Sequence, residues 1–143
     1  MFTGEYNHTI DAKGRLIIPA KFREGLGEKF WIAKGLDGCL NAYSDEEWEK
    51  LDNWLKSLPS AKKETRAVKR FFMSGAIEAE LDKQGRTLLT SQLREHAGLT
   101  KDVVLVGVGD KVEIWSAERW ASASAPENIE DMAESLGDIG FNL

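Results

Sequence analysis

One short charged turn occurs twice in this chain, and any fold must accommodate both copies. Asp11–Arg15 reads D-A-K-G-R and Asp82–Arg86 reads D-K-Q-G-R, so the copies lie 71 positions apart. The flanks also match, pairing Ile10 with Leu81, Ile17-Ile18 with Leu88-Leu89, Phe22 with Leu93, Arg23-Glu24 with Arg94-Glu95, and Gly27 with Gly98. With a one-residue slip, Tyr43-Ser44 matches Trp115-Ser116 and Trp48 matches Trp120. A match of this length indicates an internal duplication.

The length of the chain limits how the two copies fold. The 143 residues, of which 42% are hydrophobic, suffice for one ordinary core or for two smaller cores that pack together. Because a lone copy of about 70 residues is only marginally stable, we expect the halves to depend on each other. No apolar run could span a membrane and no signal peptide is evident, so a cytoplasmic protein with no membrane partner is expected.

Charge is distributed unevenly along the chain. The formal net charge of −5 argues against nucleic acid binding by the chain as a whole. However, residues 121–143 contain five acidic residues and no Lys or Arg, and they account for the whole net charge, so residues 1–120 are neutral. The repeated turns and one basic run give this neutral body local positive charge, the run being Lys62, Lys63, Arg66, Lys69 and Arg70. Such a body can still bind DNA.

Each copy shows the same order of elements. A strand leads into the turn, a return strand leaves it, and a short helix and a hairpin of two strands follow. In the first copy these span 5–10, 15–18, 20–26, 29–34 and 39–43, and in the second 77–81, 86–89, 92–97, 103–108 and 111–115. Between the copies, a capping box at residues 44–47 opens a helix with one apolar stripe, formed by Trp48, Leu51, Trp54, Leu55 and Leu58. Pro59 ends this helix, and 61–72 is a second one.

The domain organisation follows from this order. Because no Pro/Gly/Ser-rich linker separates the halves, we expect one body made of a first repeat with its linking helices (1–74) and a second repeat (75–120). An acidic C-terminal tail (121–143) follows. Its low apolar content and uniform negative charge predict a peripheral helix or mobile segment that makes no DNA contact.

The repeated turn satisfies the geometry of a three-residue hairpin loop. An Asp at the first position accepts a hydrogen bond from the backbone two residues on, and a Gly in the left-handed conformation closes a type I turn with a bulge. Asp11 with Gly14, and Asp82 with Gly85, meet both requirements. Turn geometry does not require the arginine that follows each glycine.

Two roles are open to Arg15 and Arg86 at the bases of these loops. A planar, permanently charged guanidinium suits phosphates and guanine edges, which favours nucleic acid binding. Alternatively, each arginine pairs with the aspartate of its own loop and only stiffens the turn, as a surface ion pair worth about 0–1 kcal/mol. The residues alone do not decide between these roles.

Four features of the chain point to one family: the doubled motif, the opening segment Met1-Phe2-Thr3-Gly4-Glu5, the helix through Trp48 and the segment Ala97-Gly98-Leu99. In these features the chain resembles the MraZ family, which belongs to the AbrB-like swapped-hairpin DNA-binding superfamily. The resemblance extends from Met1 to the region of Trp120. It implies an α+β fold in which a tandem pseudo-two-fold repeat forms an AbrB-like swapped-hairpin β-barrel with flanking helices. It also implies a bacterial, nucleoid-associated transcriptional regulator of the division and cell-wall gene cluster. Such a regulator binds repeated promoter boxes in double-stranded DNA as a ring-shaped homo-oligomer such as an octamer.

The resemblance also implies which residues bind DNA: Asp11, Lys13, Arg15, Asp82, Lys83 and Arg86. The two loops are not identical, because Lys13 is matched by Gln84 and Ala12 by Lys83. Their contributions therefore need not be equal. No catalytic residue, metal ion or cofactor is expected.

Two other classes of function compete with DNA binding. An enzyme could use Asp11 and Asp82 as a carboxylate pair if the loops faced each other around a pocket, with a nucleophile or base beside them. The chain supplies no Ser/His or Cys/His constellation near them. A non-catalytic structural or protein-interaction module without DNA contact is the stronger alternative. Steeply salt-dependent binding to promoter DNA would distinguish the regulator from both.

Three further features are assigned structural roles. The basic run 62–70 is expected to be a solvated helix face and is excluded from the site. The tryptophans are expected in the core and in subunit interfaces rather than stacked on bases, namely Trp31, Trp48, Trp54, Trp115 and Trp120. Cys39 is expected to be a small buried strand residue, and with only His8 and His96 beside it there is no zinc ligand cluster.

Overall fold

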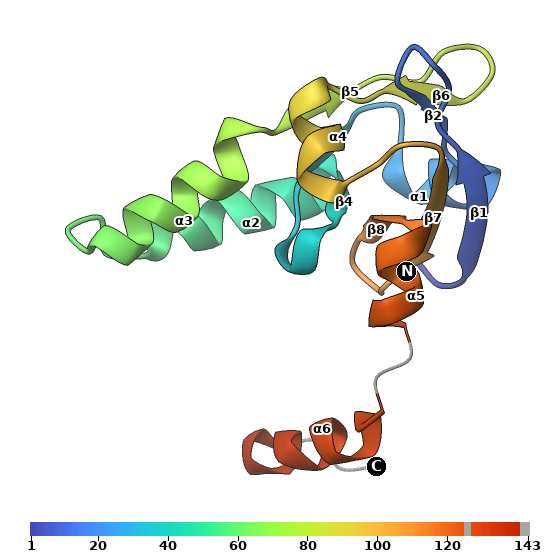
Figure 1. Ribbon diagram of the computed structural model, residues 1–143. Helices are drawn as coiled ribbons and strands as arrows, with labels where there is room; N and C mark the ends of the chain where they lie inside the picture. The colour runs from blue at the N-terminus through green and yellow to red at the C-terminus, as the bar shows by residue number, and fades with distance from the viewer. Residues whose placement is uncertain (125–126, 141–143) are drawn as a thin grey trace.

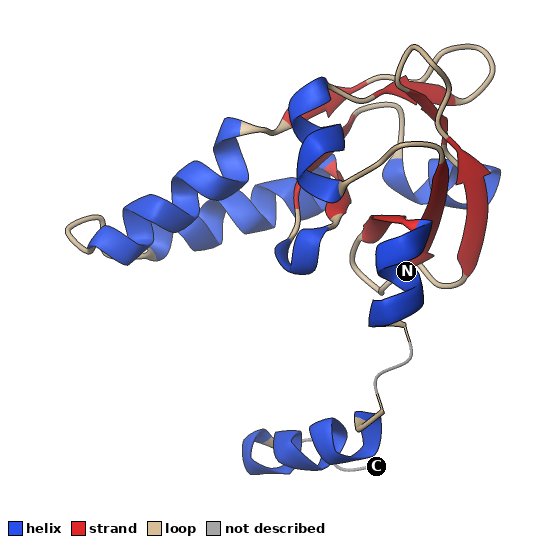
Figure 2. Cartoon of the chain, viewed as in Figure 1, coloured by secondary structure: helices blue, strands red, loops and turns tan. Residues whose placement is uncertain are grey.

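The computed structural model describes residues 1–124 and 127–140, and these form the α+β fold that the sequence predicts (Figure 1). The strands are β1 (Glu5–Thr9), β2 (Arg15–Ile17), β3 (Phe30–Lys34), β4 (Leu40–Ser44), β5 (Ile77–Ala79), β6 (Arg86–Leu88), β7 (Asp102–Gly107) and β8 (Val112–Ser116). The helices are α1 (Ala20–Leu26), α2 (Asp45–Ser57), α3 (Lys63–Ser74), α4 (Ser91–Ala97), α5 (Ala117–Ala123) and α6 (Ile129–Ser135), with 3-10 turns at Leu36–Gly38 and Leu136–Ile139. The strands gather in one body, and α2 and α3 extend from it as an arm (Figure 2).

The larger sheet interleaves the two repeats. Its six strands lie in the order β1-β7-β8-β4-β3-β5. This order is symmetric: each strand and its counterpart in the other repeat lie at equal distances from the centre of the sheet. The first strand of each repeat pairs with the third strand of the other, because β1 pairs with β7 and β5 with β3. At the centre, β4 pairs with β8, with Asn41 opposite Glu113. The two halves are therefore intertwined about a pseudo-two-fold axis.

The return strands of the two turns, β2 and β6, form a separate antiparallel ribbon. Leu16 lies opposite Thr87 at its centre, and both side chains are buried. Each turn is also bonded to the other repeat: the N–H of Ile18 donates to the carbonyl of Gly85 at 2.9 Å, and that of Leu89 to Gly14 at 2.9 Å. Since β1 and β5 remain the edges of the larger sheet, the barrel implied by the resemblance is open in its hydrogen bonding.

The core draws matched residues from both repeats. Phe22 of α1 and Leu93 of α4 are almost fully buried, as are Leu16 of the ribbon and Leu89 next to it. The ring of Phe22 also meets Phe2 edge-on, with ring centroids 5.9 Å apart. Each buried side chain of this size contributes about 1.5–3 kcal/mol relative to an exposed one. The core therefore holds α1, α4 and the ribbon in fixed positions.

Local signals define the helices well. Helix α1 spans the predicted residues, and Gly27 follows it with φ +81°. Thr90 caps α4 by accepting a hydrogen bond from the N–H of Leu93 at 3.3 Å, and Gly98 ends this helix in the left-handed conformation. The matched residues Ser44 and Ser116 cap α2 and α5. Helix α5 is thus the shorter counterpart of α2.

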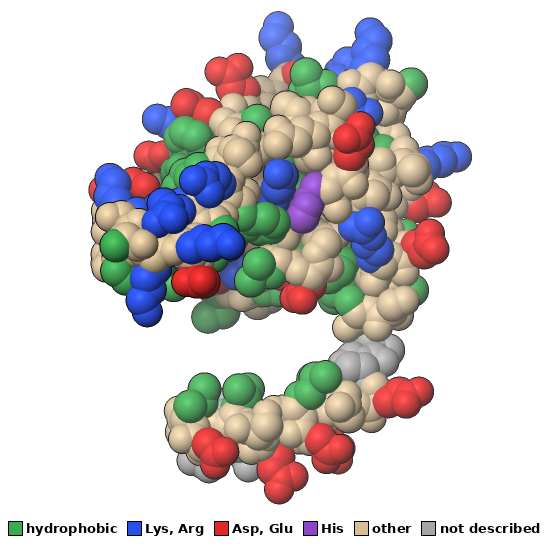
Figure 3. Space-filling model, turned by 60° about the vertical axis from the view of Figure 1, so that its left-hand side comes forward, with side chains coloured by type: hydrophobic (Ala, Val, Ile, Leu, Met, Phe, Trp, Pro, Cys, Tyr) green, Lys and Arg blue, Asp and Glu red, His purple; other side chains and the backbone are tan. Residues whose placement is uncertain are grey.

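The arm contains two of the tryptophans expected in the core or in subunit interfaces, Trp48 and Trp54. Trp48 of α2 is buried and stacks on Trp31, with ring centroids 5.2 Å apart. Trp54, on the same predicted apolar stripe, is 54% exposed in the single chain, so a place in a subunit interface stays a prediction for it. Trp54 is exposed because the later turns of α2 extend past the sheet, where α3 runs beside it (Figure 1). As expected, the basic run lies on exposed surface of this arm, where Lys and Arg side chains gather (Figure 3).

The C-terminal region forms a peripheral helix, which is one of the two forms predicted for it. Its apolar content differs from the expectation. Helix α6 and the 3-10 turn that follows it lie apart from the body (Figure 1), and together they expose an apolar stripe beside their acidic residues. The stripe consists of Ile129, Met132, Leu136 and Ile139. The expectation of low apolar content is therefore wrong for this segment, because four spaced residues suffice for an amphipathic helix. Residues 125–126 and 141–143 of the predicted tail lie outside the described residues.

Cys39 is fully buried, as predicted, immediately before β4. Its Sγ donates a hydrogen bond to the carbonyl of Leu36 at 3.2 Å. Burial raises the pKa of this thiol to about 12, so the thiol stays protonated at neutral pH. No helix in the described part of the chain is long and apolar enough to cross a membrane.

Separated halves should not fold, because both sheets take strands from both repeats. We expect fragments 1–74 and 75–143, each produced alone, to be poorly soluble or to melt without cooperativity. Mixing the two fragments should restore a cooperative transition, which thermal unfolding followed by circular dichroism would detect. A soluble, cooperatively melting fragment would contradict the intertwined fold.

Candidate nucleic-acid interface

The first loop is closed by the carboxylate of Asp11. Its Oδ1 accepts hydrogen bonds from the backbone N–H groups of Lys13 at 3.0 Å and Arg15 at 2.9 Å. The N–H of Gly14 donates to the Asp11 carbonyl at 3.0 Å, and Gly14 has φ +84°. This is the predicted three-residue turn, in which a side chain at the glycine position would be strained.

The second loop repeats this geometry. Oδ1 of Asp82 accepts from the N–H groups of Gln84 and Arg86, both at 2.9 Å. Gly85 donates to the Asp82 carbonyl at 3.0 Å and has φ +78°. The two motifs are therefore structurally equivalent, although only the first has a lysine at its third position.

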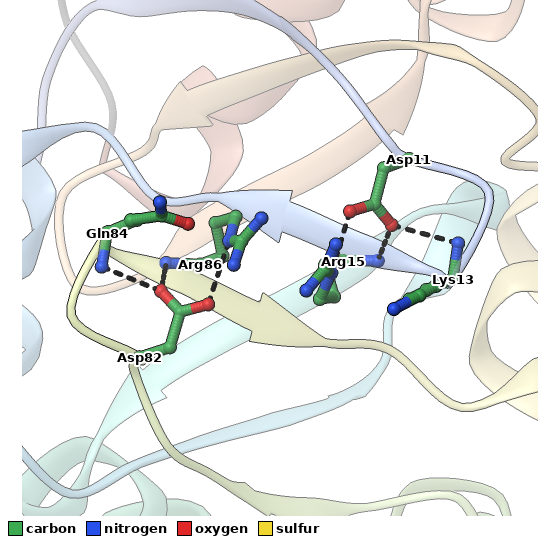
Figure 4. A network of polar contacts seen from close by, with 6 residues as sticks. All are labelled: Asp11, Lys13, Arg15, Asp82, Gln84 and Arg86. Atoms are coloured by element: carbon green, nitrogen blue, oxygen red, sulfur yellow. Dashed lines mark hydrogen bonds and ion pairs between the residues drawn. The ribbon is translucent and has the colours of Figure 1, made fainter.

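Each arginine pairs with its own aspartate through one nitrogen only. Nε of Arg15 lies 2.7 Å from Oδ2 of Asp11, and Nε of Arg86 lies 2.8 Å from Oδ2 of Asp82 (Figure 4). Within residues 1–124 and 127–140, neither arginine uses its terminal nitrogens, Nη1 and Nη2, in a further hydrogen bond. The stiffening role proposed for these pairs is thus present. It leaves the terminal donors of both guanidinium groups available.

Both arginines lie on one face of the β2·β6 ribbon, with the two loops at its opposite ends (Figure 4). Alternation along a strand explains this placement, because residues 15 and 17 and residues 86 and 88 point outward while Leu16 and Thr87 point into the core. The outward face is solvent-accessible, and the loops that flank it are at the top of the molecule in Figure 1. A ligand that meets this face meets both arginines.

The loop bonds also fix the charge of the two carboxylates. The backbone N–H of Arg15, followed by its guanidinium, lowers the pKa of Asp11 below the ordinary value of 3.8. Arg86 acts on Asp82 in the same order and direction. Both carboxylates are therefore ionised at neutral pH, and each loop keeps its ion pair there.

Sequence reasoning missed a second pair of arginines, Arg23 and Arg94, which support the loops from behind. A β-carbon added to Gly14 would lie 3.0 Å from Nε of Arg94, and one added to Gly85 would overlap the guanidinium of Arg23. Each loop is thus backed by a helix of the other repeat. Nε of Arg94 also donates to the carbonyl of Leu89 at 3.2 Å. The available signal was the matched Arg-Glu dipeptide in both copies.

The remaining predicted residues lie on the loop tips. Lys13 and Lys83 are exposed, at the third position of the first loop and the second position of the other. Next to the ribbon, a groove of about 440 Å³ is lined by Arg15, Arg86 and residues 77–82, and it includes Glu78 and Glu80. The matched residues of the first repeat are neutral asparagine and threonine. The surface around the ribbon is therefore more acidic on the side of the second repeat.

The carboxylate-pair alternative requires a different arrangement. Asp11 and Asp82 lie at opposite ends of the ribbon, and each is bonded within its own loop (Figure 4). They do not face each other across a pocket. Among the described residues, no group of three or more His, Cys, Asp or Glu could hold a metal ion.

Comparison with known families decides the relationship of this chain. The family described as "MraZ protein, putative antitoxin-like" matches residues 1–71 and again 72–136. The chain belongs to the MraZ family. The two matched segments begin 71 positions apart, which is the offset of the repeated turns. The duplication and the resemblance inferred from the sequence are both confirmed.

Individual relatives agree over the whole chain. A protein of Acetivibrio thermocellus is 56% identical over 143 residues, covering 99% of this chain and 100% of its own length. A protein of Lachnoclostridium phytofermentans is 54% identical, covering 100% of both chains. A protein of Lactobacillus gasseri is 54% identical, covering 97% of this chain and 99% of its own length. Each of these relatives is named "Transcriptional regulator MraZ".

Replacing both loop aspartates by asparagine should lower stability at neutral pH but not in acid. A carboxylate with a lowered pKa stabilises the folded state above its unfolded pKa, and this stabilisation disappears as the pH falls through the folded value. The wild-type protein should therefore lose more unfolding free energy between about pH 6 and about pH 3 than the Asp11→Asn/Asp82→Asn variant loses. Urea denaturation across this range measures the difference, and Asp131→Asn, on exposed α6, is the control. Parallel pH profiles for the wild type and the double variant would contradict the loop assignment.

Proposed function

We propose that this protein is a sequence-specific DNA-binding transcriptional regulator that contacts DNA through the outer face of the β2·β6 ribbon and its two loops. The observation that carries the proposal is the placement of Arg15 and Arg86 on one exposed face, each held through Nε with its terminal donors available. The names of the relatives support the regulatory role. The proposed DNA-binding residues are Asp11, Lys13, Arg15, Asp82, Lys83 and Arg86.

The major groove of B-DNA admits a two-stranded β-ribbon, and β2 and β6 form one. There the terminal donors of Arg15 and Arg86 would bind O6 and N7 of guanine, the commonest specific contact of arginine with DNA. Lys13 and Lys83 at the loop tips would bind phosphates and fix the register. Asp11 and Asp82 act indirectly, because they orient the arginines and hold the turns. Preorganised arginines lose less conformational entropy on binding than free ones.

The distribution of charge is compatible with such binding. The acidic residues responsible for the net charge lie beyond residue 120, and α6 lies apart from the ribbon (Figure 1). We expect the tail (121–143) to make no DNA contact and to oppose non-specific binding by repelling phosphates. The two repeat segments (1–74 and 75–120) then form the DNA-binding body together.

The proposed target is a set of repeated promoter boxes in the division and cell-wall gene cluster, bound in the cytoplasm at the nucleoid. One arginine contact is worth about 1–3 kcal/mol, which is too little alone for useful operator affinity. A ring-shaped homo-oligomer, such as an octamer, would present the same ribbon several times. Affinity would then multiply if the spacing of the boxes matched the spacing of the ribbons.

Replacing either ribbon arginine should weaken binding to duplexes selected from a random pool by the wild-type protein. A lost bidentate contact of about 1–3 kcal/mol corresponds to about five- to 150-fold at each engaged ribbon. We therefore expect Arg15→Ala and Arg86→Ala each to lower affinity at least tenfold, and the double variant to lose specific binding. Arg70→Ala removes an exposed arginine of the arm and is the matched control, expected to bind like the wild type. Fluorescence anisotropy at several salt concentrations measures the wild type and all four variants.

Oligomer size, measured by light scattering, separates DNA contact from assembly. Wild-type affinity in the Arg15→Ala/Arg86→Ala protein would contradict the proposed interface. Loss of assembly together with loss of binding would favour the alternative, a structural or protein-interaction module.

Arg15→Lys tests whether geometry or charge matters at this position. A lysine keeps the positive charge but has no planar group that can pair with Asp11 and bind guanine at the same time. We expect it to retain non-specific affinity and to lose preference for the selected sequence over a scrambled duplex. Preserved sequence preference would indicate that Arg15 contacts only phosphates.

A further inference from the structure

On the outer face of the ribbon, each arginine lies beside an apolar side chain of the other repeat. Arg15 is opposite Leu88, and Arg86 is opposite Ile17. Directly opposed residues of an antiparallel pair project from the same face, with β-carbons about 4.5–5.5 Å apart. The ribbon therefore presents two equivalent pairs, each made of one guanidinium and one branched aliphatic side chain.

The core does not account for the placement of these aliphatic side chains. Leu88 is 60% exposed and Ile17 is 39% exposed, whereas the next residues, Leu89 and Ile18, are each 1% exposed. A single exposed apolar residue needs no explanation. Here, however, two occupy matched positions of the duplicated motif, and both lie beside an arginine. A ligand fits both pairs if it carries an apolar group next to hydrogen-bond acceptors that a guanidinium group can bind.

Building on the function proposed above, we propose that Ile17 and Leu88 recognise thymine through its C5-methyl group, next to a guanine bound by the opposing arginine. In the major groove, thymine presents a methyl group and guanine presents two acceptors. Successive base pairs are about 3.4 Å apart, so two opposed side chains with β-carbons about 4.5–5.5 Å apart can reach the edges of neighbouring bases. Each pair, Arg15 with Leu88 or Arg86 with Ile17, therefore selects a guanine and a thymine in neighbouring base pairs.

Deoxyuridine tests this inference because it differs from thymidine only by lacking the methyl group. Duplexes are first selected from a random pool by the wild-type protein and then synthesised with each thymidine replaced in turn by deoxyuridine. Loss of a buried methyl group weakens binding about fourfold. We expect this loss at thymines next to a required guanine and no change at other thymines. This measurement needs no protein variant and so does not depend on the folding of one.

Protein variants then assign the methyl contact to particular side chains. Leu88→Ser and Ile17→Ser should each bind the thymidine duplex less tightly, and each should lose the deoxyuridine effect only at the thymine that its own pair contacts. Leu88→Val and Ile17→Val should restore the discrimination, because they restore an aliphatic side chain. Val108→Ser removes an exposed apolar residue outside the ribbon and should discriminate like the wild type.

Three results would overturn the inference in distinguishable ways. If deoxyuridine has no effect at any position while Arg15→Ala still abolishes selected binding, thymine recognition is wrong and the proposed function stands. If the protein selects no sequence from the pool, both fail. Equal discrimination by the wild type and the serine variants would also overturn it, because the methyl group would then contact other residues.

Discussion

The aspartate carboxylate at the start of each turn is the interaction on which the ribbon surface depends. One oxygen of Asp11 accepts two backbone N–H groups and shapes the loop, and the other accepts Nε of Arg15. The same group therefore closes the turn and orients the side chain at its base. Because an arginine has five N–H donors, engaging Nε leaves the four terminal donors for a ligand. The ion pair and DNA binding are thus compatible uses of the same residue.

The duplication places this unit twice on one face and makes each copy depend on the other. Each loop is bonded to the opposite return strand and is backed by an arginine from the opposite repeat. The copies have nevertheless diverged. Nε of Arg94 bonds a backbone carbonyl, whereas Nε of the matched Arg23 is buried without a partner among the described residues. Glu78 and Glu80 add negative charge beside the second loop alone. A ribbon with two matched arginines and unequal surroundings would bind its target in a preferred direction.

The sequence predicted the features that depend on local chemistry. The Asp/Gly turns and helix α1 followed from residues a few positions apart. It did not show that β1 pairs with β7 or that Arg94 supports the first loop, because these contacts join residues of different repeats. Helical periodicity also placed Trp48 and Trp54 on one apolar stripe but could not show that only Trp48 is buried within the chain, because periodicity does not reveal where the packing partner ends. The six proposed site residues could be named from the motif, whereas the shared face of Arg15 and Arg86 required the strand register.

A structure of the protein bound to a selected DNA duplex, at a resolution that shows the guanidinium groups, is the most direct measurement. We predict that Nε of Arg15 and Arg86 remains bonded to Asp11 and Asp82, and that their terminal nitrogens bind guanine in the major groove. A complex in which the ribbon faces solvent would contradict this interpretation. So would one in which the arginines leave their aspartates to bind phosphates, because the loop carboxylates would then have no part in recognition.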